Sequence, residues 1–172
     1  CRSMAGRVTL RVYYSFMNAQ VFLPSERLAP FVHSFMIIES AEGMVNTILP
    51  DIHMVMAFCF RGKVTYREGG ELQLLPSAAI SGLRQSARVL EYHQQTSTLL
   101  VKFTEAGAAA FLPLPPAELF NHTVAADQVM TQHQASDLCE QLAGAGNHEQ
   151  RIAQVENMLL SLIDEQKADV LI

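Results

Sequence analysis

The sequence predicts an α+β protein: an antiparallel β-barrel or double-sheet jelly roll followed by a helical segment. Short apolar or alternating segments recur about every 8–12 residues between residues 31 and 104, a spacing typical of such folds. After residue 104 the composition changes, and apolar residues recur at helical spacing. The chain has 172 residues, of which 49% are hydrophobic and 17% charged, so it can bury one well-formed core.

This pattern divides the chain into three segments. Residues 17–104 are predicted to form the barrel, and residues 105–172 a helical segment for dimerisation and linkage. Residues 1–16 differ from both, because they carry three basic residues and no acidic one. Two interpretations stay open for them: the alternation of apolar residues from Val8 to Tyr14 predicts a first strand, whereas the composition and the methionine that follows fit a leader or an added segment.

Turn-forming residues separate the predicted elements. Ser25 is expected to cap a single helical turn that Pro30 ends, and Gly69-Gly70 is typical of a hairpin turn. The predicted strands cover residues 31–38, 45–60, 63–67, 71–75, 78–84, 88–93 and 97–104. The predicted helices cover residues 104–111, 117–120 and 126–143, and a last helix begins after Asn147 as its cap.

The stretch that follows Leu49-Pro50-Asp51 is the centre of the ligand hypothesis. Alternation along a strand places large, soft side chains on one face (Met54, Met56, Phe58, Phe60) and smaller ones on the other (His53, Val55, Ala57, Cys59). A ligand pocket is mostly apolar with a few placed polar groups. The candidate ligand-binding residues are therefore His53, Met54, Met56, Phe58, Arg84 and Tyr92, with Arg84 suited to a carboxylate or phosphate.

An alternative interpretation stays open for these residues. The Met and Phe face can be ordinary barrel core, and Arg84 can be a surface residue in an ion pair. Under that alternative, the barrel is filled by its own side chains and binds nothing.

The last helix carries an apolar stripe that is wider than one packing partner requires. Its members recur at steps of three and four residues, and we expect them to form a homodimer interface. The candidate interface residues are Ile152, Val155, Leu159, Leu162 and Ile163. The alternative is a helix that packs against the barrel of its own chain.

The residues offer little for catalysis. The six histidines are scattered with no His-x-His pair, so we predict no metal site and no cofactor. Ser81-Gly82 lacks the Gly-x-Ser-x-Gly pattern, and nothing near Cys59 in the sequence would activate its thiol. The sequence therefore predicts that the chain is not an enzyme.

Charge and cysteine content restrict the setting of the protein. A net charge of −5 argues against binding of nucleic acid or an anionic membrane by this chain. The three cysteines are odd in number and lack metal-ligand spacing, which favours a reduced, cytoplasmic protein. No apolar stretch approaches the roughly 18 residues of a membrane span, and no signal peptide is recognisable.

Several segments, taken in order, resemble the N-terminal sensing region of AraC-type transcriptional regulators. They are residues 28–35 (LAPFVHSF), 49–51 (LPD), 81–84 (SGLR), 100–109 (LVKFTEAGAA), 116–121 (PAELFN) and 149–156 (EQRIAQVE). The resemblance covers about residues 24–164. It implies a cupin-like barrel, helices that mediate dimerisation, and helix-turn-helix units that bind DNA and are absent from this chain.

The favoured hypothesis is an effector-sensing and dimerisation domain of a transcriptional regulator. Its small-molecule effector is unidentified, and it would contact DNA only through a domain outside these residues. A cupin-type metal-dependent enzyme or a sugar-binding protein is the first alternative. A structural oligomerisation domain that binds no ligand is the second.

Overall fold

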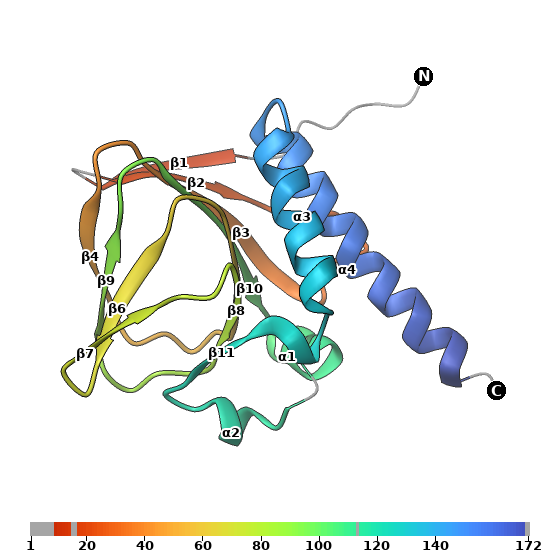
Figure 1. The fold of residues 1–172 in the computed structure, drawn as a ribbon. Coiled ribbons are helices and arrows are strands. Elements are labelled where there is room, and N and C mark those ends of the chain that lie inside the picture. Colours follow the sequence, from red (N-terminus) through yellow and green to blue (C-terminus); the bar gives the residue numbers. More distant parts are fainter. Residues whose placement is uncertain (1–8, 15–16, 113, 171–172) are drawn as a thin grey trace.

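Two antiparallel sheets form the body of the protein (Figure 1), in a computed structural model that describes residues 9–14, 17–112 and 114–170. The larger sheet has the strand order β1 (Thr9–Tyr14), β2 (Met17–Phe22), β3 (Val32–Ser40), β10 (Thr96–Phe103), β5 (Val55–Arg61), β8 (Ala78–Ser81), β11 (Thr123–Ala125). The smaller sheet has the order β4 (Met44–Ile48), β9 (Arg88–Tyr92), β6 (Val64–Glu68), β7 (Glu71–Leu74). The predicted α+β class, with a double-sheet jelly roll followed by helices, is confirmed.

The helices follow the barrel in the chain and lie largely on one side of it. They are α1 (Glu105–Phe111), α2 (Pro116–Leu119), the 3₁₀ turn η1 (Ala126–Gln128), α3 (Gln132–Gly144) and α4 (His148–Val170). Figure 1 shows α3 and α4 side by side against the outside of the larger sheet. Among the described residues, no helix combines the length and apolar character that a membrane crossing requires.

Side-chain caps explain where two of the helices begin. The Thr104 hydroxyl accepts a hydrogen bond from the Gly107 N–H at 3.1 Å, as expected for the predicted cap of α1. The helix predicted over residues 126–143 begins only at Gln132. Thr131 and Gln134 form a reciprocal capping box there, and the residues before it make the separate turn η1.

The prediction of one strand over residues 45–60 is wrong, because these residues form two strands that belong to different sheets. β4 ends at Ile48 and β5 begins at Val55. Pro50 lacks the N–H that a continuous strand would need, and the Asp51 carboxylate accepts a bond from the His53 N–H at 3.1 Å. This local turn carries the chain from one sheet to the other.

The two edge strands of the larger sheet, β1 and β11, and the strand β2 beside β1 bear on the predicted boundaries. β1 pairs with β2 over the full length of both, so residues 9–14 belong to the sheet; the rest of residues 1–16 lies outside the described residues. β2 and β11 were not predicted. β11 is only three residues long and pairs with β8, so the sheet extends beyond the predicted boundary at residue 104.

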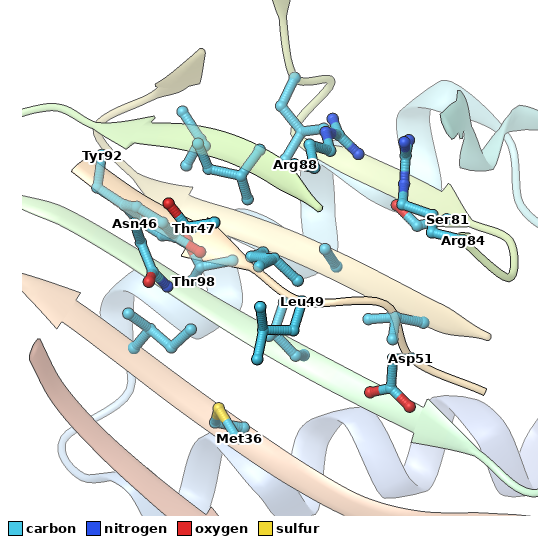
Figure 2. Close-up of a pocket in the computed structure, with 18 of the residues that line it drawn as sticks. Met36, Asn46, Thr47, Leu49, Asp51, Ser81, Arg84, Arg88, Tyr92 and Thr98 are labelled. Carbon is cyan, nitrogen blue, oxygen red and sulfur yellow. The ribbon is translucent and has the colours of Figure 1, made fainter. Parts of the chain in front are cut away.

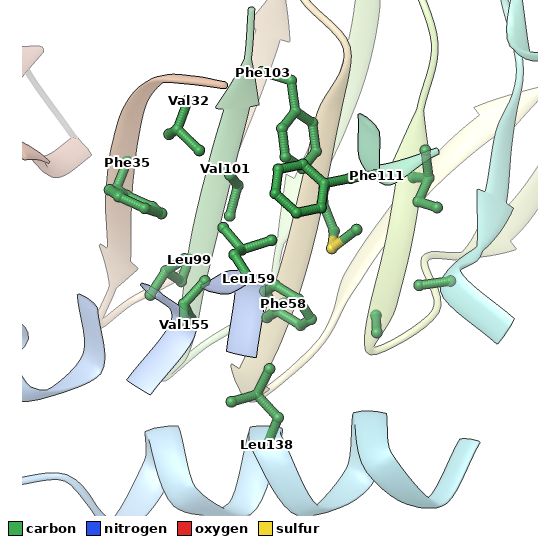
Figure 3. Packing of buried hydrophobic residues seen from close by; sticks show 14 of the residues in the cluster. Val32, Phe35, Phe58, Leu99, Val101, Phe103, Phe111, Leu138, Val155 and Leu159 are labelled. Carbon is green, nitrogen blue, oxygen red and sulfur yellow. The ribbon is translucent and has the colours of Figure 1, made fainter. Parts of the chain in front are cut away.

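The main hydrophobic core lies between the larger sheet and the helices, not between the two sheets (Figure 3). Phe58 of β5 and Leu99 of β10 are fully buried there, and Leu138 of α3 is buried in the same cluster. A second, smaller cluster between the sheets contains Ile38 and Leu90. The outer layer of helices is therefore part of the fold's stability.

The apolar stripe of α4 packs within its own chain. Ile152, Val155 and Leu159 are each 0% exposed and belong to the main core, and Leu162 and Ile163 are partly buried against it. The prediction that these five residues form a dimer interface is wrong for the first three, because the larger sheet already covers them. The helix-on-barrel alternative describes this stripe.

Two buried polar side chains fasten α4 to its surroundings. The Arg151 guanidinium donates to the Leu142 carbonyl at 2.8 Å and to the Ala145 carbonyl at 3.0 Å, which satisfies the end of α3. The Glu156 carboxylate accepts a bond from the Ser25 N–H at 2.8 Å. α4 is thus held by directed bonds as well as by apolar packing.

Gly107 gives a direct test of how closely α1 approaches the barrel. A Cβ at Gly107 would overlap the Phe31 carbonyl oxygen, which also accepts a hydrogen bond from the Thr104 N–H at 2.9 Å. Gly107→Ala should lower the free energy of unfolding by at least about 2 kcal/mol, because backbone must move to make room. Gly144→Ala is the matched control, since nothing lies within 4 Å of a Cβ there. Urea unfolding of both variants checks this, and equal stabilities would contradict the close approach.

Candidate functional site

A cavity of about 590 Å³ lies between the two sheets (Figure 2). This volume falls within the range of small-molecule sites. Its walls come from strands of both sheets and from the connections between them. The apolar part of the lining includes Met36, Ile38, Met44, Ile48, Val55, Ala57, Val64, Leu75, Leu90 and Leu100.

The cavity face of β5 is the face with the smaller side chains. His53, Val55 and Ala57 line the cavity. Met54, Met56 and Phe58 are at most 4% exposed and pack in the core beneath the helices. The prediction that Met54, Met56 and Phe58 form a wall of the ligand pocket is therefore wrong, because the helices require the large side chains on the outer face of the sheet.

The adjacent strand β10 repeats this division. Thr98, Leu100 and Lys102 face the cavity, whereas Leu99, Val101 and Phe103 face the helices. β5 and β10 are hydrogen-bonded neighbours, with Leu100 opposite Ala57 and Leu99 opposite Phe58. The cavity and the helical layer therefore lie on opposite faces of a single layer of β-sheet.

Arg84, Arg88 and Ser81 line one side of the cavity (Figure 2), and the Thr123 hydroxyl behind them joins them into a polar cluster. Ser81 and Thr123 are register partners in β8 and β11, and their hydroxyl oxygens lie 2.9 Å apart. Arg84 and Arg88 both donate to the Thr123 hydroxyl, at 3.0 and 2.6 Å. The two guanidinium groups thus converge on one neutral oxygen.

Arg88 packs against an aromatic ring, and among the described residues it forms no ion pair with a carboxylate. Its guanidinium carbon lies 3.9 Å from the centre of the Tyr66 ring, a cation–π contact. The residue is only 9% exposed. Burial, and after it the charge of Arg84, lower the pKa of Arg88 to about 10, so the group remains protonated at neutral pH.

A second polar cluster lies where the chain enters β5, in the same sheet as Ser81, since Lys102 and Ser81 are the register partners of Val55 on its two sides. The Asp51 carboxylate accepts from the Lys102 ammonium at 2.8 Å and contacts the His53 Nδ1 at 2.7 Å. The ring of His53 also lies 4.7 Å from that of His33, centre to centre. In this cluster, the Asp51 carboxylate compensates the positive charge of Lys102.

The hydrogen bonds at Asp51 predict a pH dependence. Burial would raise the pKa of this carboxyl, but bonds from Lys102 and His53 outweigh it and hold the pKa at about 2, below the ordinary 3.8. Because the folded pKa is depressed, the stabilisation is full above the ordinary value and is lost as pH falls towards about 2.

Asp51→Asn isolates this charge, since an asparagine oxygen can still accept the bond from the His53 N–H. At neutral pH the variant should lose up to about 1 kcal/mol of stability, a partly exposed pair being worth no more. The difference from wild type should vanish as pH falls from 3.8 to about 2. Asp164→Asn removes an exposed ion pair of 3.4 Å and is the control. Urea titrations across this pH range would contradict the assignment if both variants behaved alike.

Of the predicted site residues, the structure brings three to the cavity: His53, Arg84 and Tyr92. Burial raises the pKa of Tyr92 to about 12, so its hydroxyl remains a donor at neutral pH. Figure 2 shows Tyr92 near Asn46 and Thr47, across the cavity from Arg84. Their role in ligand binding stays a prediction.

The residues around the cavity do not fit the metal centre of a metal-dependent cupin. That centre needs three or four converging His, Glu or similar ligands. Across the described part of the chain, no group of three or more His, Cys, Asp or Glu side chains could hold an ion. His93, which follows β9 of the smaller sheet, hydrogen-bonds to the Thr65 hydroxyl at 3.0 Å and is outside the cavity lining.

The sequence matches one known protein family. Residues 20–125 match the domain of unknown function DUF6597. The chain belongs to the DUF6597 family. The matched segment spans the barrel from β2 to β11 and so includes the cavity and both polar clusters. No curated protein matches the sequence significantly.

The solved structures that resemble this DUF6597 chain are of low sequence identity, and several are described as cupin domains. A cupin 2 conserved barrel protein from Salinispora arenicola is 13% identical, with a TM-score of 0.42 over 58% of this chain and 86% of that one. The cupin 2 domain of an XRE family transcriptional regulator from Enterobacter cloacae is 12% identical, with a TM-score of 0.39 over 53% and 100%. Ectoine synthase from P. lautus is 16% identical, with a TM-score of 0.41 over 63% and 72%.

These likenesses concern the fold, which is cupin-like as the resemblance implied. They also correct one prediction. Because the structures that share the fold include an enzyme, ectoine synthase, the exclusion of enzymatic activity from sequence was wrong. The AraC-type assignment is not confirmed by these comparisons.

Sequence reasoning missed Arg88, Thr123, Asp51 and Lys102 as members of the polar clusters. Arg88 and Thr123 come from strands in different sheets, and only the fold brings them together. Asp51 carried a usable signal, because an Asp directly after Pro and before a strand is typical of a turn whose carboxylate is held close to the chain.

Proposed function

We propose that this DUF6597 chain is the ligand-sensing domain of a cytoplasmic transcriptional regulator. A small molecule would bind in the 590 Å³ cavity between the sheets, and its binding would alter the helical layer. The single observation that carries the proposal is that only one layer of β-sheet separates the cavity from the helices. One strand, β5, presents Val55 and Ala57 to the cavity and Met56 and Phe58 to the helices.

This arrangement gives a physical path for coupling. A ligand that presses on Ala57 or Leu100 moves strands whose other faces contact Leu138 of α3 and Leu159 of α4. Close-packed cores transmit such displacements and do not absorb them. The ligand can shift the helices only to the extent that it binds two arrangements with different affinity, typically by about 1–3 kcal/mol.

The regulatory part of the proposal rests on the resemblance to AraC-type proteins. In that arrangement, helix-turn-helix units outside residues 1–172 contact DNA, and the sensing domain forms a homodimer. Since Ile152, Val155 and Leu159 are buried within one chain, a homodimer would use other, exposed residues. Leu162 and Ile163 are only partly buried and remain available for contacts at the edge of such an interface.

Calorimetry and hydrogen exchange of this chain test the sensing role. Octanoate, 1-octanol, benzoate and arabinose serve as probes of different chemistry. At least one should raise the melting temperature and change amide exchange in α3 or α4. If none changes either quantity, the sensing proposal fails.

Product analysis of the same mixtures separates the alternatives, since conversion of a bound probe would indicate an enzyme. For the regulator itself, a binding probe should change the affinity of the full-length protein for DNA.

A further inference from the structure

The arginine cluster of the cavity is incompletely satisfied. Thr123 accepts from Arg84 and from Arg88, which uses both lone pairs of its oxygen. Its own proton must therefore be donated to the Ser81 oxygen, 2.9 Å away. No further acceptor is left on this hydroxyl, although each guanidinium has five N–H donors.

Three of the remaining donor nitrogens of the two arginines lack partners. Nε and one terminal nitrogen of Arg88, and Nε of Arg84, are buried without a hydrogen bond. Within residues 9–14, 17–112 and 114–170, neither guanidinium forms an ion pair within 4.0 Å. Buried, unpaired donors are costly, and a charged group without a counter-ion is more costly still.

The charge balance of the lining points the same way. The cavity is lined by three cationic side chains and one carboxylate. Asp51, the carboxylate, is bound to Lys102 at 2.8 Å. Arg84 and Arg88 thus have no carboxylate partner in the cavity lining, and Glu68, outside the lining, acts on Arg88 only through its charge, in a chain whose net charge is −5.

We infer that the cavity binds an organic carboxylate with an apolar body, whose carboxylate is held by Arg84 and Arg88. Planar guanidinium groups match a carboxylate through paired N–H···O bonds, and the unused donors are of this kind. The aliphatic walls, among them Leu90 and Leu100, would hold the rest of the molecule. This inference rests on the proposed ligand-sensing function and narrows it to one chemical class.

Matched ligands test the inference. Titration calorimetry compares octanoate with 1-octanol, which differ at the polar end, and with inorganic phosphate, which lacks the apolar body. Octanoate should bind at least about tenfold more tightly than either. If 1-octanol binds and octanoate does not, the carboxylate inference is overturned while the ligand-sensing function survives. If phosphate binds as tightly as octanoate, the apolar part is overturned. If no probe binds, the sensing function fails as well.

Arg88→Met tests the residue itself. The variant should lose about 10- to 100-fold in affinity for octanoate and keep its affinity for 1-octanol. Arg67→Met, at an exposed hairpin position, removes the same charge and should change neither. Equal losses in the two variants would attribute the effect to net charge and overturn the inference.

The stability of the unliganded variant separates binding from a structural role. If the arginine serves a ligand, the melting temperature of Arg88→Met without ligand should be no lower than that of the wild type. A lower melting temperature together with unchanged octanoate affinity would make Arg88 a structural residue and overturn the inference. Should Arg88→Met not fold, the half-buried Arg84→Met is titrated in the same way, with the same expected loss for octanoate.

Discussion

Leu159→Lys should unfold the protein or bring it close to unfolding. Leu159 is 0% exposed in the core between α4 and the larger sheet. Truncation of such a leucine typically costs about 2–5 kcal/mol, and a buried unpaired ammonium adds to this. We expect a loss of at least about 4 kcal/mol, a large share of the 5–15 kcal/mol typical of a domain. Urea unfolding followed by circular dichroism measures the loss.

Asn157→Lys is the control, because Asn157 is exposed on the same helix. It should change stability by less than about 0.5 kcal/mol. Size-exclusion chromatography of both variants distinguishes packing from assembly. A Leu159→Lys protein that stays folded but changes from dimer to monomer would contradict the packing described here and restore the stripe as an interface.

The two faces of β5 should respond differently to substitution. Phe58→Ala removes a fully buried ring between the sheet and the helices, and should cost about 3–5 kcal/mol. Ala57→Val adds two carbons to the cavity side, where there is room, and should change stability by less than about 1 kcal/mol. Thermal and urea unfolding of the two variants provide the comparison.

The informative result is which of the two substitutions lowers the free energy of unfolding more. If Ala57→Val were the more destabilising change, the cavity would lie on the other face of the strand. The valine variant should also weaken octanoate binding, because its methyl groups occupy part of the cavity. Unchanged binding to Ala57→Val would place the ligand away from β5.

The fold class was predictable because its signals are local. Turn residues at regular spacing marked most strands, and capping residues such as Thr104 marked helix starts. Two errors in the predicted strands have different causes. β11 has only three residues, too few for a periodic signal, and it forms by pairing with β8. The break at Pro50 was visible in the sequence, but the apolar run that follows it favoured one continuous strand.

The candidate site was less predictable, for a physical reason. Alternation along β5 separates two faces correctly, but it does not say which one looks into the barrel. Large Met and Phe side chains suit a ligand wall and a helix interface equally well. The position of the helices determines which face looks into the barrel, because their apolar residues pack against the face of β5 that carries the large side chains. For the same reason, the wide stripe on α4 predicts a dimer interface from sequence, although Ile152, Val155 and Leu159 are buried within their own chain.

Methionine methyl groups offer the most direct test of ligand binding between the two sheets. Met36 and Met44 line the cavity, whereas Met54 and Met56 lie in the core under the helices. With methyl-labelled methionine and resonances assigned by single Met→Leu variants, NMR spectra are recorded as octanoate is added. Binding in the cavity predicts the largest shifts at Met36 and Met44. Larger shifts at Met54 and Met56, or no shift at any of the four, would contradict it.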